Sequence, residues 1–295
     1  MKVIRTIKEM KQIVKYLKKN NQDIGFVPTM GSLHAGHLAL VKEAKKESDS
    51  IILSIFVNPL QFGENEDFDS YPRDEQKDFK LADEQGVDYV FVPFVEEMYP
   101  NALGITMSIN KRIGVLCDRS RPGHFQGVLI VLSKLFHIIQ PDFTYFGMKD
   151  AQQIAIVDLL IDELNFPIQL RMVPTVREEN GLAKSSRNIR LSSVEKEEAP
   201  FLYQALKHGE KLIIEGQRST NKLISELTLF LQNNLSGKID YVEVLTFPDL
   251  EEKTQIESRV IIGLAVQFEK VRLIDNLIID LNEIEKRRDD VSNNA

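Results

Sequence analysis

The residue types that this 295-residue chain lacks exclude several classes of protein: it has no tryptophan, one cysteine and five histidines. The single cysteine, Cys117, permits no internal disulfide, which is typical of proteins in the reducing cytosol. No apolar run approaches the roughly 20 residues of a membrane-spanning helix. The first residues, Met1 to Arg5, lack the apolar stretch of a signal peptide. We therefore expect a cytoplasmic protein.

Basic residues are also in deficit. The chain has 37 Lys and Arg against 44 Asp and Glu, a net charge of −7, whereas nucleic-acid-binding proteins usually carry a basic excess or stripe. An anionic substrate would therefore be held by a few local groups. With 43% hydrophobic and 27% charged residues the composition is that of a globular protein, and the length suggests two domains.

Helix-like and strand-like segments alternate up to about residue 174. The apolar spacing predicts helices over 7–17, 38–47, 74–85, 124–139 and 151–164, and strands over 24–28, 50–57, 88–92, 142–146 and 168–173. This alternation predicts an α/β fold with a doubly wound, Rossmann-like parallel sheet. Ligands bind such sheets at the carboxyl ends of the strands, so the residues there are candidates for a site.

The pattern changes after residue 175. Helices are predicted over 194–216 and 220–235, and strands joined by short turns over 239–245, 258–266 and 271–279. We therefore expect a Rossmann-like ligand-binding domain over 1–175, a small α+β domain over 176–285 and a flexible polar tail over 286–295.

The most informative segment, Pro28 to His37, links the first predicted strand to a helix. Free backbone N–H groups and the helix dipole at such a turn favour a phosphate. His34 and His37 are three residues apart and share one face, where two imidazoles can stabilise charge that develops during attack on phosphorus. Gly31 and Gly36 allow a tight turn. The pattern H-x-G-H is typical of adenylyl-transferring enzymes.

A metal site is the alternative for this histidine pair. Zinc needs three or four ligands, and the other histidines, His124, His137 and His208, have no matching spacing. We therefore predict no protein-bound metal.

Amide side chains follow two of the predicted strands. Asn58 and Gln61 come directly after the second strand, and Gln153 lies one turn into a later helix. Neutral amides can orient a small polar substrate, although each could also be a solvent-facing side chain. In the same later segment Lys149 can neutralise phosphate, Gly147 allows close backbone approach, and Asp150 suits a helix N-cap.

Two further segments carry basic groups. Arg121 precedes a long helix and could meet a phosphate or a carboxylate, or lie on the surface. Ser185, Ser186 and Arg187 lie between the two predicted domains, on a loop that could close over a polyphosphate or serve as a flexible linker.

Five stretches, PTMGSLHAGH, NPLQF, RPGHFQGV, FGMKDAQQ and REENGLAKSSRN, occur in this order within residues 28–191. Together they resemble the pantothenate synthetase (pantoate–β-alanine ligase) family of the HxGH nucleotidyltransferase-like superfamily. The resemblance implies condensation of (R)-pantoate with β-alanine, driven by cleavage of ATP to AMP and pyrophosphate through a pantoyl adenylate. It also implies that the carboxyl-terminal domain closes over a site in the amino-terminal one.

The resemblance assigns residues by their motif positions. Pantoate would contact Gln61 and Gln153, and β-alanine would contact Gln61. The catalytic set would be His37 (a candidate proton donor), His34, Lys149 and Arg187. The residues that would hold ATP are Met30, Gly31, Ser32, Leu33, His34, Ala35, Gly36, His37, Gly147, Met148, Lys149, Asp150, Val176, Lys184, Ser185, Ser186 and Arg187.

The resemblance further implies Mg²⁺ bound mostly through phosphate oxygens and water, and a cytosolic homodimer formed through the amino-terminal domain. Three positions depart from the family pattern: Asn180 replaces an aspartate, Lys184 stands where Met or Leu is common, and Arg190 replaces a tyrosine. Loop closure is the property these departures affect.

Two other functions remain open at this stage. Another HxGH adenylyltransferase would need a second phosphate-bearing substrate and would not release AMP. An ATP-binding regulatory module would show no turnover. A tRNA synthetase is disfavoured by the charge and by the lack of an anticodon-binding region. The sequence lacks a Walker P-loop, a G-x-G-x-x-G and a G-x-S-x-G motif, which disfavours kinases, dehydrogenases and hydrolases.

Overall fold

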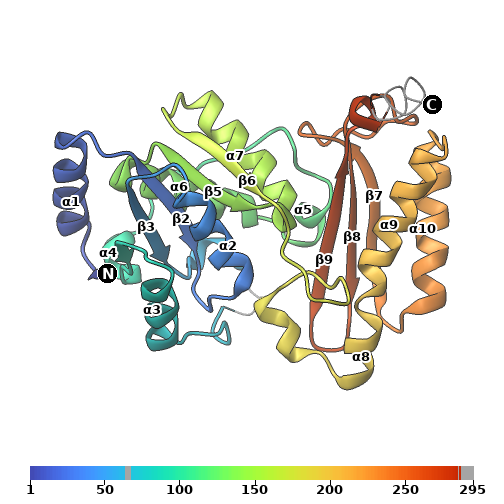
Figure 1. The fold of residues 1–295 in the computed structure, drawn as a ribbon, viewed down its shortest axis with the longest axis horizontal. Coiled ribbons are helices and arrows are strands. Elements are labelled where there is room, and N and C mark those ends of the chain that lie inside the picture. The colour runs from blue at the N-terminus through green and yellow to red at the C-terminus, as the bar shows by residue number, and fades with distance from the viewer. Residues whose placement is uncertain (64–67, 285, 287–295) are drawn as a thin grey trace. The chain divides into compact units, whose positions relative to one another are not determined.

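The computed structural model describes residues 1–63, 68–284 and 286 (Figure 1). The predicted tail over 286–295 lies outside the described residues, apart from Lys286. The chain forms two compact units. The amino-terminal unit comprises Met1–Asn110 and Asp118–Val176, and the carboxyl-terminal unit comprises Lys111–Cys117 and Arg177–Ala295.

The amino-terminal unit contains a six-stranded sheet in the order β1-β4-β3-β2-β5-β6, in which every neighbouring pair is parallel. The strands are β1 (Lys2–Ile4), β2 (Ile24–Thr29), β3 (Ser50–Ile55), β4 (Tyr89–Phe91), β5 (Phe143–Gly147) and β6 (Gln169–Val173). The predicted doubly wound fold is confirmed. The chain reverses its direction of travel across the sheet between β2 and β5, and this switch point is where such folds bind ligands.

Helices connect these strands. They are α1 (Ile7–Lys19), α2 (Ala35–Ala44), α3 (Glu75–Glu84), α4 (Val95–Met98), α5 (Cys117–Ser120), α6 (His124–Ile139) and α7 (Ala151–Glu163), with the 3₁₀ turns η1 (Pro59–Gln61) and η2 (Met148–Asp150). Side-chain caps fix two of the starts, because Thr6 accepts from the Glu9 N–H and Asp74 accepts from the Lys77 N–H. Within the described ranges no helix has the length and hydropathy needed to cross a bilayer.

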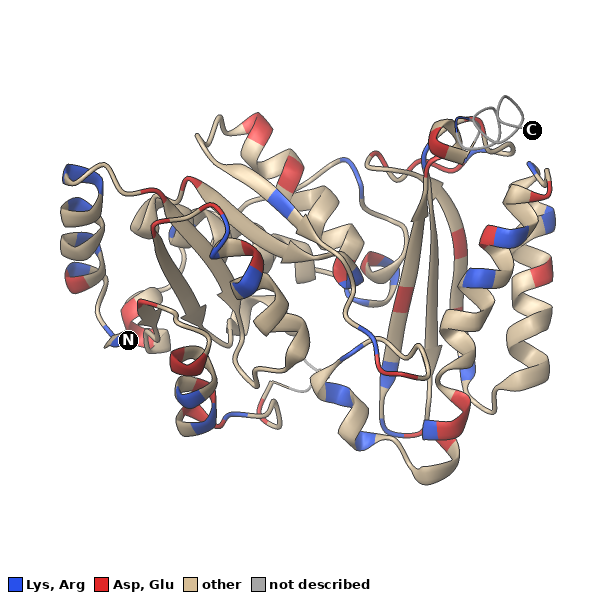
Figure 2. Ribbon diagram, viewed as in Figure 1, with Lys and Arg blue, Asp and Glu red and all other residues tan. Residues whose placement is uncertain are grey.

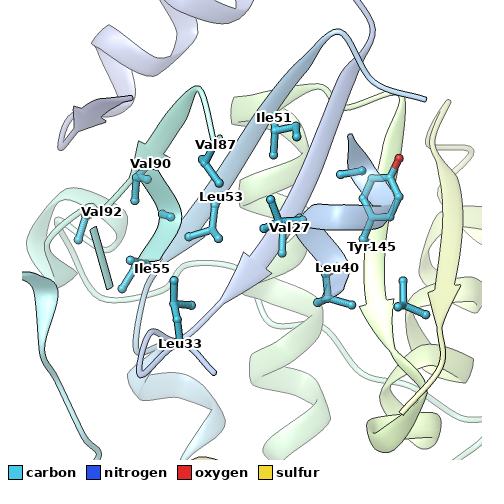
Figure 3. Packing of buried hydrophobic residues seen from close by; sticks show 14 residues of the cluster. Val27, Leu33, Leu40, Ile51, Leu53, Ile55, Val87, Val90, Val92 and Tyr145 are labelled. Carbon is cyan, nitrogen blue, oxygen red and sulfur yellow. The ribbon is translucent and has the colours of Figure 1, made fainter. Parts of the chain in front are cut away.

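The sheet is buried on both faces. On one face Val27 of β2 and Leu53 of β3 join a cluster with Leu40 of α2 (Figure 3). On the other, Phe26 meets Phe136 of α6 edge to face, with ring centroids 6.4 Å apart. Because neither face is solvated, β2 and β3 contain no charged residue (Figure 2). This packing holds the loops at the strand ends on a rigid base.

The carboxyl-terminal unit contains an antiparallel sheet in the order β7-β8-β9. Its elements are η3 (Ser186–Arg190), α8 (Ser193–Glu198), α9 (Phe201–Ile214), α10 (Thr220–Asn234), β7 (Lys238–Thr246), β8 (Val260–Gln267) and β9 (Arg272–Ile279). Leu206 of α9, Leu227 of α10 and Ile262 of β8 belong to one fully buried cluster, which packs the two helices on the sheet.

Two expectations for this unit were wrong. The helix predicted over 194–216 is two helices, because Pro200 separates α8 from α9 and lacks the N–H that a continuous helix needs. The link from β7 to β8 is not a short turn: residues 247–259 form a longer connection that pairs with its surroundings through bridges at Glu252 and Gln255.

Candidate active site

The turn from β2 into α2 is held in an unusual conformation. Gly31 and Ser32 both have positive φ, 81° and 51°, a region that glycine adopts freely and serine does not. Thr29 Oγ1 accepts the Gly31 N–H at 3.1 Å and donates to the Ser54 carbonyl at 2.7 Å. The start of the turn is therefore tied to the neighbouring strand β3.

Asp78 of α3 holds the rest of this turn. Its buried carboxylate accepts the Ser32 N–H at 2.8 Å and the Leu33 N–H at 2.7 Å. Burial raises the Asp78 pKa, and these two hydrogen bonds oppose that rise. A Cβ on Gly31 would lie 2.9 Å from Asp78 Oδ2, so glycine is needed there. The prediction that this turn presents free amides was wrong for residues 31–33, whose N–H groups already have protein acceptors.

His34 and His37 come together at the start of α2. Their ring centroids are 4.1 Å apart. His37 Nδ1 accepts the His34 N–H at 3.3 Å, and His34 Nδ1 accepts the Gly36 N–H at 3.1 Å, which forms a capping box. Because each Nδ1 is an acceptor, each neutral ring carries its proton on Nε2. The turn thus offers two imidazole N–H donors.

His37 is neutral at physiological pH. Burial, followed by electrostatic interactions with His34 and Lys149, lowers its pKa to about 3, while Asp150 opposes the shift. Three other predicted site residues, His34 from the end of β2 and Lys149 and Asp150 from the end of β5, therefore lie close enough to act electrostatically on the His37 imidazole. They meet at the switch point of the sheet.

The segment after β5 differs from expectation in one respect. Asp150 is the N-cap residue of α7, but its side chain makes no capping hydrogen bond to any described residue. Its carboxylate instead acts electrostatically on His37. Around Gly147, no described non-neighbouring atom lies within 4 Å of where a Cβ would be, which leaves room for close approach of a ligand.

Gln61 is held by several hydrogen bonds, through both its side chain and its backbone carbonyl. Its side-chain Nε2 donates to Met30 Sδ at 3.0 Å, and its backbone carbonyl accepts from His124 Nδ1 at 2.8 Å. Arg121 donates to the same carbonyl at 3.4 Å and lies 3.1 Å from His124 Nε2. Arg121 therefore contacts the Gln61 turn and not solvent alone. Gln61 is 8% exposed, so its position is fixed by packing.

Gly127 allows η1 to lie against α6. A Cβ at this position would be 2.2 Å from the Leu60 carbonyl oxygen and 2.6 Å from the Gln61 amide nitrogen. The RPGHFQG stretch thus supports the Gln61 turn through both His124 and Gly127.

The remaining predicted residues fall in both units. Gln153 is a half-buried residue in the first turn of α7, and Val176 follows β6 at the end of the amino-terminal unit. Lys184, Ser185, Ser186 and Arg187 lie in the carboxyl-terminal unit.

Residues 177–183 form an ordered hairpin, which is followed by η3 and is not an irregular linker. Arg177 pairs with Ala183 in an antiparallel bridge, and Ser185 Oγ accepts the Arg187 N–H at 3.2 Å. Asn180 Oδ1 accepts the Leu182 N–H at 3.1 Å. Aspartate has the same oxygen, so this departure preserves the turn.

Two other contacts stabilise the hairpin. Lys184 Nζ lies 3.4 Å from the Glu178 carboxylate. Arg177 donates to both carboxylate oxygens of Asp275, at 2.6 and 3.0 Å, and lies 3.8 Å from the Tyr203 ring centroid. Arg177, the first residue of the REENGLAKSSRN stretch, therefore has a structural role.

Sequence reasoning missed two supporting residues, Asp78 and Tyr99. Asp78 shares the buried face of α3 with Ala82. An acidic residue at a core-facing helical position was a signal available in the sequence. Tyr99 left no comparable signal, because its role depends on a contact with Asn58.

The fold and this site define a Rossmann-like enzyme of the HxGH type. The sequence matches the family described as Pantoate-beta-alanine ligase over residues 2–278, and the chain belongs to that family.

Its relatives include the pantothenate synthetase of Bacillus pumilus, 52% identical over 286 residues that cover 96% of this chain and 98% of the relative. That of Bacillus subtilis is 49% identical over 286 residues, which cover 97% and 100%.

Solved structures of the family are also similar. The pantothenate synthetase of Thermus thermophilus has a TM-score of 0.88 and 39% identity, and the match covers 94% of this chain and 99% of that one. The pantoate-beta-alanine ligase of Francisella tularensis, complexed with beta-gamma ATP and beta-alanine, has a TM-score of 0.77 and 34% identity, with coverage of 94% and 97%.

Proposed function

We propose that this protein condenses (R)-pantoate with β-alanine in two steps at the carboxyl ends of β2, β3 and β5. First, a pantoate carboxylate oxygen attacks the α-phosphorus of ATP, and pyrophosphate leaves. Then the β-alanine amine attacks the acyl carbon, a C–N bond forms, the amine loses a proton, and AMP leaves with the electrons of the broken C–O bond. The observation that carries this proposal is the meeting of His34, His37 and Lys149 at the switch point.

The histidine pair suits the first step. Two Nε2–H donors and one ammonium group can stabilise the negative charge that builds up on the phosphate oxygens. His37 is neutral before ATP binds, and a nearby polyphosphate would raise its pKa, because anions favour the imidazolium form. His37 would then serve as the proton donor, and Lys149 would neutralise phosphate charge.

ATP would lie along residues 30–37, 147–150 and the backbone near Val176. From the carboxyl-terminal unit, Lys184, Ser185, Ser186 and Arg187 would close on the phosphates. Closure of basic and hydroxyl groups over a reactive acyl phosphate would exclude water and limit hydrolysis.

Gln61 and Gln153 would hold pantoate, and Gln61 would also contact β-alanine. Pantoate offers a carboxylate and two hydroxyls, which suit amides that can both donate and accept. Both glutamines follow strands of the same parallel sheet, β3 and β5, at their carboxyl ends.

Mg²⁺ would arrive with ATP. In the described part of the chain no group of three or more His, Cys, Asp or Glu side chains could hold a metal ion. The ion would therefore be bound by phosphate oxygens and water, as Mg²⁺ often is, and would neutralise phosphate charge.

We further propose a cytoplasmic homodimer formed through the amino-terminal unit. Leu103 and Ile105 are 39% and 78% exposed. They border a largely apolar cavity of about 430 Å³ that also involves Ile130 and His137 of α6. Exposed apolar side chains of this kind are typical of protein interfaces, and a second copy of this chain is the occupant we propose. Sedimentation velocity on wild type and Ile105→Asp tests it, with a monomeric variant expected.

A rapid-quench experiment tests the reaction order. Labelled ATP and pantoate without β-alanine should give one equivalent of pyrophosphate and bound pantoyl adenylate, and adding β-alanine should release AMP and pantothenate. Pyrophosphate that forms only when β-alanine is present would contradict the two-step order. An adenylylated product in place of AMP would favour another HxGH adenylyltransferase.

A second measurement tests the placement of pantoate. Each unpaired substrate group would weaken binding by about 1–3 kcal/mol. Gln61→Ala and Gln153→Ala should therefore weaken pantoate use much more than ATP binding, as measured by titrating ATP and then pantoate. If ATP affinity falls as far as pantoate affinity, the glutamines are not the pantoate pocket.

A further inference from the structure

A partly buried hydrogen-bond chain runs from Tyr99, at the end of α4, to Gln61. Tyr99 Oη donates to Asn58 Oδ1 at 2.9 Å, and Asn58 Nδ2 donates to Gln61 Oε1 at 3.2 Å. Asn58 also accepts from the Leu60 N–H at 3.3 Å and donates to the Gly127 carbonyl at 3.0 Å. It is 1% exposed, and both ends of its amide are fully paired.

The partners of Asn58 fix the direction of this chain. A backbone N–H can only donate and a backbone carbonyl can only accept, so Leu60 and Gly127 determine which end of the Asn58 amide is oxygen. Asn58 must then present an N–H to Gln61, and this bond orients the Gln61 amide with Oε1 toward Asn58. The Gln61 Nε2 lies on the other side of the amide, and its partner in the structure is the thioether of Met30, a weak acceptor.

Tyr99 is itself well anchored. Its ring packs against Phe56, with centroids 6.0 Å apart, and Lys134 Nζ lies 5.4 Å from the ring centroid. Burial raises the pKa of its hydroxyl, so the hydroxyl keeps its proton at physiological pH. Its bond to Asn58 is the shorter of the two that Asn58 Oδ1 accepts.

We propose that Tyr99, acting through Asn58, is a positioning residue that fixes Gln61 as an N–H donor toward the substrate. This inference rests on the proposed pantoate site. The position next to Gln61 Nε2 then takes a substrate oxygen that accepts a hydrogen bond, such as a carboxylate or hydroxyl oxygen of pantoate, and disfavours a group that can only donate.

The test is Tyr99→Phe, which removes one hydroxyl and keeps the ring. With one acceptor bond lost, the amides of Asn58 and Gln61 are less firmly held, so the KM for pantoate should rise about three- to tenfold. The KM for ATP should stay unchanged. Because Tyr99 acts through Gln61, the double variant Tyr99→Phe/Gln61→Ala should use pantoate no worse than Gln61→Ala alone.

The matched control is Tyr145→Phe. Tyr145 also lies in the amino-terminal unit and is buried, but its hydroxyl contacts Glu47 and Ser48, which precede the amino end of β3. This control should leave the KM for pantoate unchanged.

Two outcomes would overturn the inference while the proposed function stands: an unchanged KM for pantoate in folded Tyr99→Phe, or additive effects of Tyr99→Phe and Gln61→Ala. An unchanged KM for pantoate in Gln61→Ala itself would instead overturn the pantoate site, and the inference with it.

Discussion

The imidazole rings of His34 and His37 lie 4.1 Å apart, and the Nδ1 atom of each accepts a backbone N–H at the start of α2. The same two histidines therefore form both the helix cap and the proposed phosphate-binding pair. Capping fixes the tautomer, and the tautomer points both remaining N–H groups away from the helix backbone. Neither ring needs to reorganise before a phosphate arrives, which is the condition for effective electrostatic stabilisation.

Removing this pair or its lysine should impair chemistry and leave the fold intact. His37→Ala and Lys149→Ala should each lower turnover by ~10²-fold or more, the scale for losing one preorganised donor. Steady-state kinetics with thermal melts separate activity from folding. His208→Ala is the control, because His208 stacks on Phe230 in the carboxyl-terminal unit. Near-normal turnover in a folded His37 or Lys149 variant would refute the role of that residue.

The pKa of His37 predicts how stability depends on pH. In the unfolded chain His37 takes up a proton near pH 6.5, whereas in the folded protein burial and His34 lower its pKa to about 3. Between these values the unfolded state binds more protons, so this residue makes the folded protein less stable as the pH falls from about 6.5 toward 3. In His37→Gln that contribution disappears.

Urea unfolding of wild type and His37→Gln at several pH values between about 7 and 4 measures the difference. The free energy of unfolding should fall less steeply with decreasing pH in the variant. Parallel curves would mean that His37 titrates normally in the folded state.

The fold was largely predictable because local sequence determines it. Strands such as Ser50–Ile55 are uninterrupted apolar or small-residue runs, since both faces of the sheet are covered. Among the features that the sequence did not predict, the strand Lys2–Ile4 has three residues, too few to show a pattern. Pro200 interrupts an amphipathic segment whose apolar spacing is that of one long helix.

Residue type and position relative to a strand predicted only part of the site. The H-x-G-H spacing placed two histidines on one face, and the structure places their rings together. The pairing of the turn amides with Asp78, and of Arg177 with Asp275, joins residues far apart in sequence. One sequence contains no information on which distant carboxylate meets which donor.

Asp78→Asn should lower kcat while the protein stays folded. An asparagine oxygen can accept one of the two N–H groups, and its NH₂ then faces the other, so the turn that carries Ser32 and Leu33 shifts. A small displacement of the adjacent His34 and His37 should lower kcat about tenfold or more. Nitrogen NMR of the imidazoles should show a loss of the single Nε2–H tautomer.

Asp88→Asn is the matched control. Asp88 Oδ2 accepts the Ile51 N–H at 2.8 Å, the same kind of contact near the amino ends of β3 and β4. It should change kcat little. Normal kcat and unchanged imidazole spectra in Asp78→Asn would show that the turn keeps its shape without the carboxylate.

Arg177→Ala should strongly destabilise the carboxyl-terminal unit. Asp275 is 3% exposed and both its carboxylate oxygens are bound by Arg177, so the variant leaves a buried charge without this partner. Such a loss lowers the free energy of unfolding by about 3–5 kcal/mol. Lys253→Ala is the control, since Lys253 and its partner Glu251 are both largely exposed and the pair contributes about 1 kcal/mol or less. Urea unfolding monitored by hydrogen exchange identifies which of the two units is destabilised.

The double variant Arg177→Ala/Asp275→Ala should recover part of the lost stability, because the unpaired charge is gone. A double variant less stable than Arg177→Ala would mean that Asp275 stabilises the unit through its other contacts, and not mainly through its pairing with Arg177.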